Sequence, residues 1–205
     1  MGKDGSKLKV AVLVSGGGTN LQALIDAAAA GKLPHAQLCL VVSSRLGVYA
    51  LERAKKADIP AQALPRREYP SKEAYSEALL RLLQEKGIEV IVLAGFLSVL
   101  SPAFCEAYRD RILNVHPSLI PAFCGDGYYG LRVHEEALRY GVKVTGATVH
   151  LVNEVTDGGR ILLQRAVEVR EGDTPETLQR RVMEQAEWVL LPQALEQVCA
   201  ELAAK

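Results

Sequence analysis

The segment Asn114-Val115-His116-Pro117 places an amide and a titratable imidazole two residues apart. Side chains at this spacing project to the same side of an extended chain, so both would face one small volume. The amide can donate a hydrogen bond to a developing oxyanion, and the imidazole can move a proton near neutral pH. The pair is therefore a candidate catalytic site, although a histidine before proline also suits a purely structural role.

A carboxylate that could serve this imidazole lies in the glycine-rich turn Thr156-Asp157-Gly158-Gly159. An ionised carboxylate beside an imidazole stabilises the charged ring and fixes its orientation. Asp157 is the candidate partner of His116. The alternative is that Asp157 only builds the turn.

The second candidate site is the loop Ser15-Gly16-Gly17-Gly18-Thr19-Asn20, which follows the buried-strand pattern of Val10–Val14. Glycine leaves the backbone N–H groups at a helix N-terminus open to an anion. A dinucleotide loop would need glycine where Leu21 stands, and no Gly-Lys-Ser/Thr of a Walker loop follows. The pattern favours a single phosphate monoester, and its alternative is a tight turn without a ligand.

Strand and helix patterns alternate along most of the chain, which predicts parallel strands joined by helices. The expected strands cover residues 10–14, 37–43, 90–93 and 112–115. The first expected helix is capped by Thr19 or Asn20 and ends at about Ala30. Three more are expected over residues 48–57, 72–86 and 102–108. Two longer strand patterns, 144–152 and 161–169, predict an antiparallel hairpin, and a last helix opens at Thr174-Pro175-Glu176. The predicted fold class is α/β, an open and mostly parallel twisted sheet with helices on both faces and an antiparallel C-terminal edge.

Composition excludes several classes of protein. The chain has 205 residues, 49% of them hydrophobic, with 24 basic and 24 acidic residues, so it lacks the basic stripe of a nucleic-acid binder. No apolar run approaches the roughly 18 residues of a membrane helix, and the polar start is no signal peptide. The four cysteines are scattered without zinc or disulfide spacing. We expect one cytoplasmic domain over residues 1–205, with residues 1–7 as a flexible tail and no metal.

Four segments together resemble the phosphoribosylglycinamide formyltransferases, a folate-dependent family of purine synthesis. The segments are Val14-Ser15-Gly16-Gly17-Gly18-Thr19-Asn20-Leu21-Gln22, Val92-Leu93-Ala94-Gly95-Phe96, Asn114-Val115-His116-Pro117-Ser118-Leu119-Ile120-Pro121 and Gly146-Ala147-Thr148-Val149-His150. The likeness spans roughly residues 8–200. It implies a Rossmann-like formyltransferase fold and transfer of a formyl group from 10-formyltetrahydrofolate to the amine of glycinamide ribonucleotide.

The resemblance also assigns roles to residues. Asn114, His116 and Asp157 match the family's catalytic residues. The ligands of the ribonucleotide phosphate and ribose would be Gly16, Gly17, Gly18, Thr19, Asn20 and Glu187. The folate would contact Lys72, Leu97, Ser98, Val99, Leu100, Asn114, Asn153, Glu154, Val155, Thr156 and Asp157. Three residues depart from the family pattern: Cys124 replaces a frequent proline, Asn153 a common aspartate, and Arg160 a usual proline.

The implied reaction is direct, through a tetrahedral species, with no metal and no covalent enzyme intermediate. The implied partners are the two small-molecule substrates, without nucleic acid or membrane, in a monomer or a homodimer. Two other functions stay open. One is a formyltetrahydrofolate hydrolase, whose members carry an additional N-terminal domain, whereas the first strand here begins at about residue 8. The other is a nucleotide-binding module without catalysis.

Overall fold

The protein is described by a computed structural model over residues 7–205. Its strands are β1 (Leu8–Val14), β2 (Ala36–Ser43), β3 (Ala61–Ala63), β4 (Val90–Leu93), β5 (Ile112–His116), β6 (Val144–Leu151) and β7 (Ile161–Glu168). Its α-helices are α1 (Thr19–Ala29), α2 (Tyr49–Lys56), α3 (Lys72–Glu85), α4 (Pro102–Ala107), α5 (Leu131–Tyr140), α6 (Pro175–Val182) and α7 (Trp188–Ala203). A 3₁₀ turn covers Arg66–Glu68, and a π-helical segment covers Met183–Glu187.

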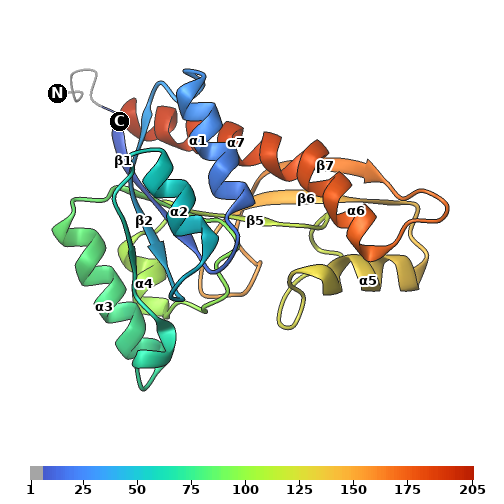
Figure 1. Cartoon of the computed structure of the whole chain (residues 1–205), viewed down its shortest axis with the longest axis horizontal. Coiled ribbons are helices and arrows are strands. Elements are labelled where there is room, and N and C mark those ends of the chain that lie inside the picture. Colours follow the sequence, from blue (N-terminus) through green and yellow to red (C-terminus); the bar gives the residue numbers. More distant parts are fainter. Residues whose placement is uncertain (1–6) are drawn as a thin grey trace.

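All seven strands belong to one sheet with the order β3-β2-β1-β4-β5-β6-β7. Strands β1 to β5 pair in parallel, whereas β6 and β7 are antiparallel to their neighbours. Figure 1 shows the long β6–β7 hairpin extending to one side of the parallel strands. The predicted α/β class, with a parallel sheet and an antiparallel C-terminal edge, is confirmed.

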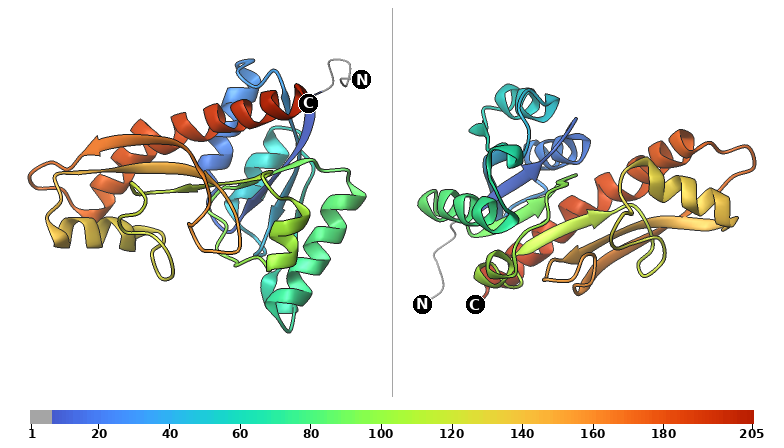
Figure 2. Two further views of the ribbon diagram at one scale, coloured as in Figure 1. Left: turned by 180° about the vertical axis from the view of Figure 1, so that it is seen from behind. Right: turned by 90° about the horizontal axis from the view of Figure 1, so that it is seen from below.

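Helices cover both faces of the sheet because the central strands are apolar on both sides. Val10, Val12 and Val14 of β1 pack into a core with α1, α2 and α7, while Ala11 and Leu13 pack into a second core with α3 and α4. A strand buried on both faces needs apolar residues at every position, unlike the alternating pattern of a half-exposed strand. The two views of Figure 2 show these helical layers on opposite sides of the strands.

The strand order reverses next to β1, which has β2 on one side and β4 on the other. In an open α/β sheet, ligands bind in the crevice outside the carboxyl ends of the strands at such a reversal. The segments that follow β1 and β4 are the glycine loop and the stretch Leu97–Leu100. The topology therefore places two of the predicted binding segments at this crevice.

The structure differs from expectation in three helices. The N-cap of α1 is Gly18, not Thr19 or Asn20. Helix α5 lies where no element was predicted, and the last helix is interrupted by the π-helical segment Met183–Glu187. The last helix begins where it was predicted to begin, since Thr174 forms a capping box with Thr177.

The predicted tail over residues 1–7 lies outside the described residues except for Lys7. That residue donates from Nζ to the Leu33 carbonyl over 3.2 Å. Across the described residues 7–205, none of the helices is both long enough and apolar enough to cross a membrane.

Candidate active site

Two antiparallel strands bring three polar side chains to one place. In the β5–β6 ladder Asn114 lies opposite His150, and His116 lies opposite Thr148. Residues directly opposite each other, and residues two apart on one strand, share a face of the sheet. Asn114, His116 and His150 therefore line one face where β5 ends, and both imidazoles are buried.

Asp157 lies at the centre of this group. Its Oδ2 is 3.4 Å from Nδ1 of His116, and its Oδ1 is 3.5 Å from Nε2 of His150. The same Oδ1 accepts from Nδ2 of Asn114 over 3.5 Å, and Oδ2 accepts from the Gly125 N–H over 2.9 Å. The carboxylate predicted as partner of His116 thus faces both imidazoles and the amide.

The charge on Asp157 is stabilised by its surroundings. Burial raises the pKa of the carboxyl, but the His150 hydrogen bond, the His116 charge and the Gly125 N–H outweigh burial. The net pKa of Asp157 lies below its ordinary value, so the group is ionised at neutral pH. A fixed negative charge therefore faces both imidazoles.

Backbone carbonyls define the tautomers of the two imidazoles, because a carbonyl oxygen can only accept. His116 donates from Nε2 to the Phe123 carbonyl over 2.8 Å, and His150 donates from Nδ1 to the Leu151 carbonyl over 2.8 Å. Asn114 Nδ2 lies 3.2 Å from Nε2 of His150 and donates to it when that ring is neutral. A second proton on either ring would point at Asp157.

Two histidines near the site were not singled out from the sequence. His150 contributes to the site only because β6 pairs with β5, and this pairing was not predicted. His134 of α5 is fully buried, and neither ring nitrogen has a hydrogen-bond partner among the described residues. Burial, and then the charge of nearby His116, lower the pKa of His134 to about 4, so this ring is neutral at neutral pH.

A cleft of about 510 Å³ opens over Asn114, His116, His150 and Asp157, and we call it the catalytic cleft. Both predicted folate walls line it, and the lining includes Leu97, Ser98, Val99, Leu100, Asn153, Glu154, Val155 and Thr156. Leu97, Val99 and Val155 are 50–60% exposed, which gives the cleft an apolar rim. Apolar walls around a few convergent polar groups are typical of small-molecule sites.

The walls of the cleft are held in place by side-chain contacts. Asn153 Oδ1 accepts from the Val155 N–H over 2.9 Å, so asparagine folds this loop on itself without a carboxylate. Thr156 donates to Asp126 over 2.9 Å and thereby ties the loop to the glycine-rich segment 125–130. Cys124 donates to the Pro121 carbonyl, and burial raises its thiol pKa.

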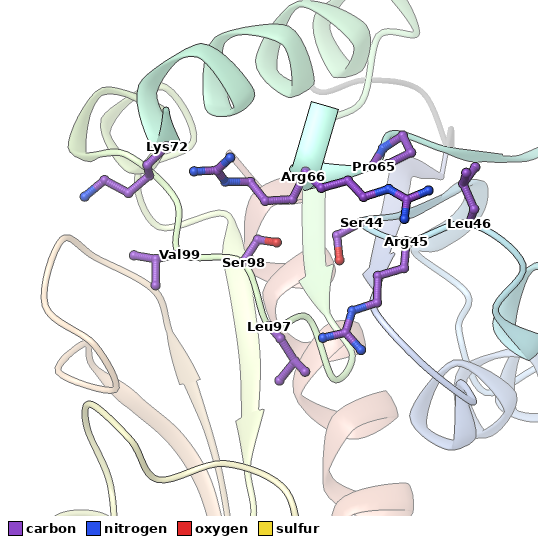
Figure 3. Close-up of a pocket in the computed structure, with 10 residues that line it drawn as sticks. Ser44, Arg45, Leu46, Pro65, Arg66, Lys72, Leu97, Ser98 and Val99 are labelled. Atoms are coloured by element: carbon purple, nitrogen blue, oxygen red, sulfur yellow. The ribbon is translucent and has the colours of Figure 1, made fainter. Parts of the chain in front are cut away.

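Lys72 does not line the catalytic cleft. It lies at the start of α3 and lines a neighbouring cavity, which shares Leu97, Ser98 and Val99 with the cleft. Figure 3 shows Lys72 in this cavity together with Arg45 and Arg66. The predicted folate ligands therefore extend over two adjoining cavities.

The glycine loop has the form expected of an anion site. Gly18 adopts φ 75° at the N-cap of α1, and no side chain caps the first turn. The first N–H groups of the helix therefore have no side-chain acceptor, and the helix dipole favours an anion at this position. Arg53 holds the loop from behind, with Nε donating to the Gly17 carbonyl over 2.8 Å.

Asn20 and Glu187 bond to each other instead of facing an open cavity. Asn20 Nδ2 donates to Glu187 Oε2 over 2.7 Å, and both side chains are buried. Burial raises the pKa of Glu187 to about 7, and the Asn20 hydrogen bond opposes that shift only in part. Glu187 ends the π-helical segment, a local widening that is frequent at functional sites.

Ser15 connects the two halves of the site. Its hydroxyl lies 2.6 Å from the Ser44 hydroxyl at the end of β2 and accepts from the Leu97 N–H over 2.9 Å. The loops after β1, β2 and β4 therefore meet at one buried side chain. Within residues 7–205, no group of three or more His, Cys, Asp or Glu side chains is placed to hold a metal ion.

Known proteins similar to this chain are formyltransferases. Residues 8–195 match the family described as formyl transferase. Phosphoribosylglycinamide formyltransferase of Haemophilus influenzae is 40% identical over 177 residues, which are 86% of this chain and 81% of that protein. The crystal structure of glycinamide ribonucleotide transformylase 1 from Symbiobacterium toebii superposes with a TM-score of 0.90 at 40% identity, covering 97% of this chain and 90% of that one.

A longer relative contains the same region as one part. The trifunctional purine biosynthetic protein adenosine-3 of Gallus gallus is 45% identical over 197 residues, which are 95% of this chain. The chain spans only 19% of that relative's length. The likeness therefore covers one segment of a much larger protein.

Proposed function

The chain belongs to the formyl transferase family, and on that basis we propose that it transfers a formyl group from 10-formyltetrahydrofolate to the amine of glycinamide ribonucleotide. One observation carries the proposal: Asp157 faces His116, His150 and Asn114 at the floor of a cleft beside an uncapped glycine loop. A nucleotide-binding module without catalysis would need the glycine loop but not the group of Asp157, His116, His150 and Asn114. The transferase names of the relatives favour transfer over hydrolysis.

The proposed reaction begins when the amine nitrogen attacks the formyl carbon and forms a tetrahedral oxyanion. Asn114 Nδ2 gives up its contact with His150 and donates to this oxyanion, and the imidazolium of His116, beside Asp157, adds to its stabilisation. The bond from carbon to the folate nitrogen then breaks, and that nitrogen takes up a proton supplied through His116 while the attacking amine loses one. Holding both substrates together contributes about 7–11 kcal/mol in well-oriented systems.

Proton delivery requires one contact in this structure to break. Nε2 of His116 donates to the Phe123 carbonyl, and Nδ1 faces Asp157. The Phe123 carbonyl must therefore release Nε2 before that proton reaches the substrate. Phe123 is held at φ 49°, a left-handed conformation that is strained for an aromatic residue.

The two substrates would occupy different parts of the crevice. The phosphate would bind the N–H groups of residues 16–20, and the ribose would reach Glu187 once its hydrogen bond to Asn20 opens. The folate would lie in the catalytic cleft with its tail toward Lys72. One sheet runs through the described residues, which supports a single domain over residues 1–205. A cytoplasmic location stays a prediction from composition.

An assay with and without glycinamide ribonucleotide tests the proposal. We expect tetrahydrofolate to form from 10-formyltetrahydrofolate only when the ribonucleotide is present, with the formyl group recovered on the amine. Tetrahydrofolate and free formate without the ribonucleotide would identify a hydrolase. Ribonucleotide binding without turnover of either kind would identify a binding module.

Substitutions in the glycine loop can separate an effect on phosphate binding from an effect on stability. An added Cβ at Gly17 meets no heavy atom within 4 Å, whereas one at Gly18 would lie 2.7 Å from Ala50 Cβ. Gly17→Val should therefore weaken ribonucleotide binding with an unchanged melting temperature, because the side chain blocks the approach of the phosphate. Gly18→Ala should lower stability, since the left-handed conformation alone costs roughly 1–2 kcal/mol.

Calorimetric titration and thermal unfolding of both variants check this prediction. Folate affinity serves as the control, because residues 15–20 do not line the catalytic cleft. An equal loss of affinity for both substrates in Gly17→Val would mean that the loop is only structural.

Glu187 should make ribonucleotide binding depend on pH. With its pKa raised to about 7, the free protein carries this carboxyl protonated below pH 7 and ionised above it. Ribose hydroxyls donate best to the ionised form, so affinity should rise between about pH 6 and about pH 8, and binding below pH 7 should release a proton.

Calorimetry in two buffers of different ionisation enthalpy measures that proton. The Glu187→Gln variant keeps the titration of the substrate phosphate, whose pKa is about 6, and removes that of the carboxyl. The pH dependence that survives in this variant belongs to the phosphate. An unchanged proton release in Glu187→Gln would contradict the role of Glu187.

A further inference from the structure

A row of three side chains crosses the antiparallel strands beside the catalytic cleft. His116 of β5 lies opposite Thr148 of β6, and Thr148 lies opposite Gln164 of β7. Residues directly opposite each other in a sheet point to the same face, so all three share the face that carries His116. Strand β7 is the outer strand of the sheet (Figure 1). The row therefore leads from His116 to the sheet edge, where Gln164 is exposed.

The chain that leaves β5 folds back over this row, and we call its residues 118–123 the return loop. Thr148 Oγ1 donates to the Ser118 carbonyl over 2.7 Å and accepts from the Ile120 N–H over 3.1 Å. Gln164 Nε2 donates to the Ile120 carbonyl over 3.0 Å and to Thr148 Oγ1 over 2.9 Å. The Gln164 amide thus binds both the return loop and the buried hydroxyl that holds it.

Contacts inside the return loop connect this anchor to His116. Ser118 Oγ donates to the Ala122 carbonyl over 2.5 Å, and the Ala122 N–H donates to the Leu119 carbonyl over 3.0 Å. The next residue is Phe123, whose carbonyl accepts from Nε2 of His116 over 2.8 Å. A displacement of the return loop therefore moves the acceptor that fixes the imidazole.

The contacts of Gln164 are made with the protein and not with a substrate site. Its side chain does not line the catalytic cleft. A hydroxyl has one donor and two acceptor positions, and Thr148 uses all three on Ser118, Ile120 and Gln164. Loss of the Gln164 amide would leave one of these positions open and would free the Ile120 carbonyl. The return loop would then be held at its middle by Thr148 alone.

We propose that Gln164 is a positioning residue for the formyl transfer: its amide fixes the return loop, and the loop in turn fixes the Phe123 carbonyl against His116. With Nε2 held there, Nδ1 of the same ring faces Asp157. This inference rests on the proposed function, because it takes His116 as the imidazole that acts on the tetrahedral species. A catalytic group displaced by about 1 Å can lose 10²-fold in rate, so the effect belongs in kcat.

Variants that keep or remove the side-chain donor test this role. Gln164→Glu keeps the shape and, when ionised, has no donor. Gln164→Met has a similar length, no donor and no charge, whereas Gln164→Lys keeps a donor. Gln37→Glu is the matched control, because Gln37 is an exposed residue of β2 at the opposite end of the sheet from the cleft. The measurements are melting temperature, kcat, KM for both substrates and NMR of the His116 ring nitrogens.

In Gln164→Glu and Gln164→Met we expect kcat to fall by about 10–10²-fold, with both KM values close to those of the wild type. Melting temperatures should stay within about 2 °C of the wild type, as for other surface substitutions. The ring-nitrogen spectrum should show that Nε2 of His116 has lost its fixed hydrogen bond. Gln164→Lys should recover most of kcat, and Gln37→Glu should match the wild type in every measurement.

Wild-type kcat in the two folded variants without a donor would overturn the inference and leave the formyl transfer intact. An equal loss in Gln164→Lys would overturn it too, because the donor would then be irrelevant. The same holds for a reduced kcat with an unchanged His116 spectrum, or for a reduced kcat that follows a fall in melting temperature. Absence of transfer by the wild type would refute the proposed function and the inference with it.

Discussion

Replacing Asp157 with asparagine should reduce turnover by about 10²–10⁴-fold while substrate binding stays close to that of the wild type. Asparagine keeps an oxygen that can accept from the Gly125 N–H, so the loop should keep its place. The negative charge that faces Nδ1 of His116 and Nε2 of His150 is lost. Without it the positive imidazole that stabilises the oxyanion becomes less favourable, and the loss appears in kcat.

The control for this variant can match its backbone as well as its chemistry. Asp157 adopts φ 54°, and Asp58 adopts φ 55° on the exposed turn after α2. Asp58→Asn makes the same change at the same left-handed conformation, away from the cleft, and should leave kcat unchanged. A folded Asp157→Asn enzyme with wild-type kcat would show that the carboxylate only builds the turn.

The pH profile of kcat gives a second check on Asp157. Because the pKa of Asp157 is lowered in the folded protein, its charge and the contacts that need it are present above its ordinary pKa. They are lost only when pH falls through the lowered value. We therefore expect no decline in kcat from this carboxyl anywhere near neutral pH.

The second large effect concerns Asn114 and His116. Loss of one oxyanion donor lowers turnover by about 10²–10³-fold, and loss of a general acid by about 10²–10⁴-fold. No hydrogen bond joins the two side chains, yet both face Asp157. Groups that act on one transition state are not additive, so the Asn114→Ala, His116→Ala variant should lose less than the product of the single losses.

Single-turnover rates, measured together with melting temperatures, decide between catalysis and folding. A catalytic role predicts folded single variants with slow chemistry. A purely structural role predicts activity that falls in proportion to the unfolded fraction. Wild-type turnover in a folded Asn114→Ala or His116→Ala enzyme would remove that residue from the mechanism.

The sequence predicted the parallel half of the fold well, because strands buried on both faces give continuous apolar runs such as Val10–Val14. Helix α5 was missed. It follows a glycine-rich stretch, and its buried face includes His134, a polar residue where an apolar one is expected. The π-helical segment was also missed, since its residues fit an ordinary helix and only the hydrogen-bond pattern distinguishes it.

The site was predicted in part for similar reasons. Asn114 and His116 are two apart on one strand, and local geometry is enough to place them together. Asp157 was paired with His116 from the chemistry of the pair. His150 needed long-range information, because its place opposite Asn114 depends on which strand β6 joins. The side chain of Asn20, a residue predicted at the phosphate, bonds to Glu187, 167 residues away, and this contact also needed long-range information.

The register between β5 and β6 sets how the site tolerates changes in chain length. Asn114 and His150 face each other through strand pairing, and side chains alternate between faces at every residue. One residue inserted inside β6 before His150 would turn that imidazole to the opposite face of the sheet. Exposed turns such as residues 170–172 can gain or lose residues without this effect. Related chains should therefore vary in length at such loops, and their β6 strands should be free of single-residue insertions and deletions.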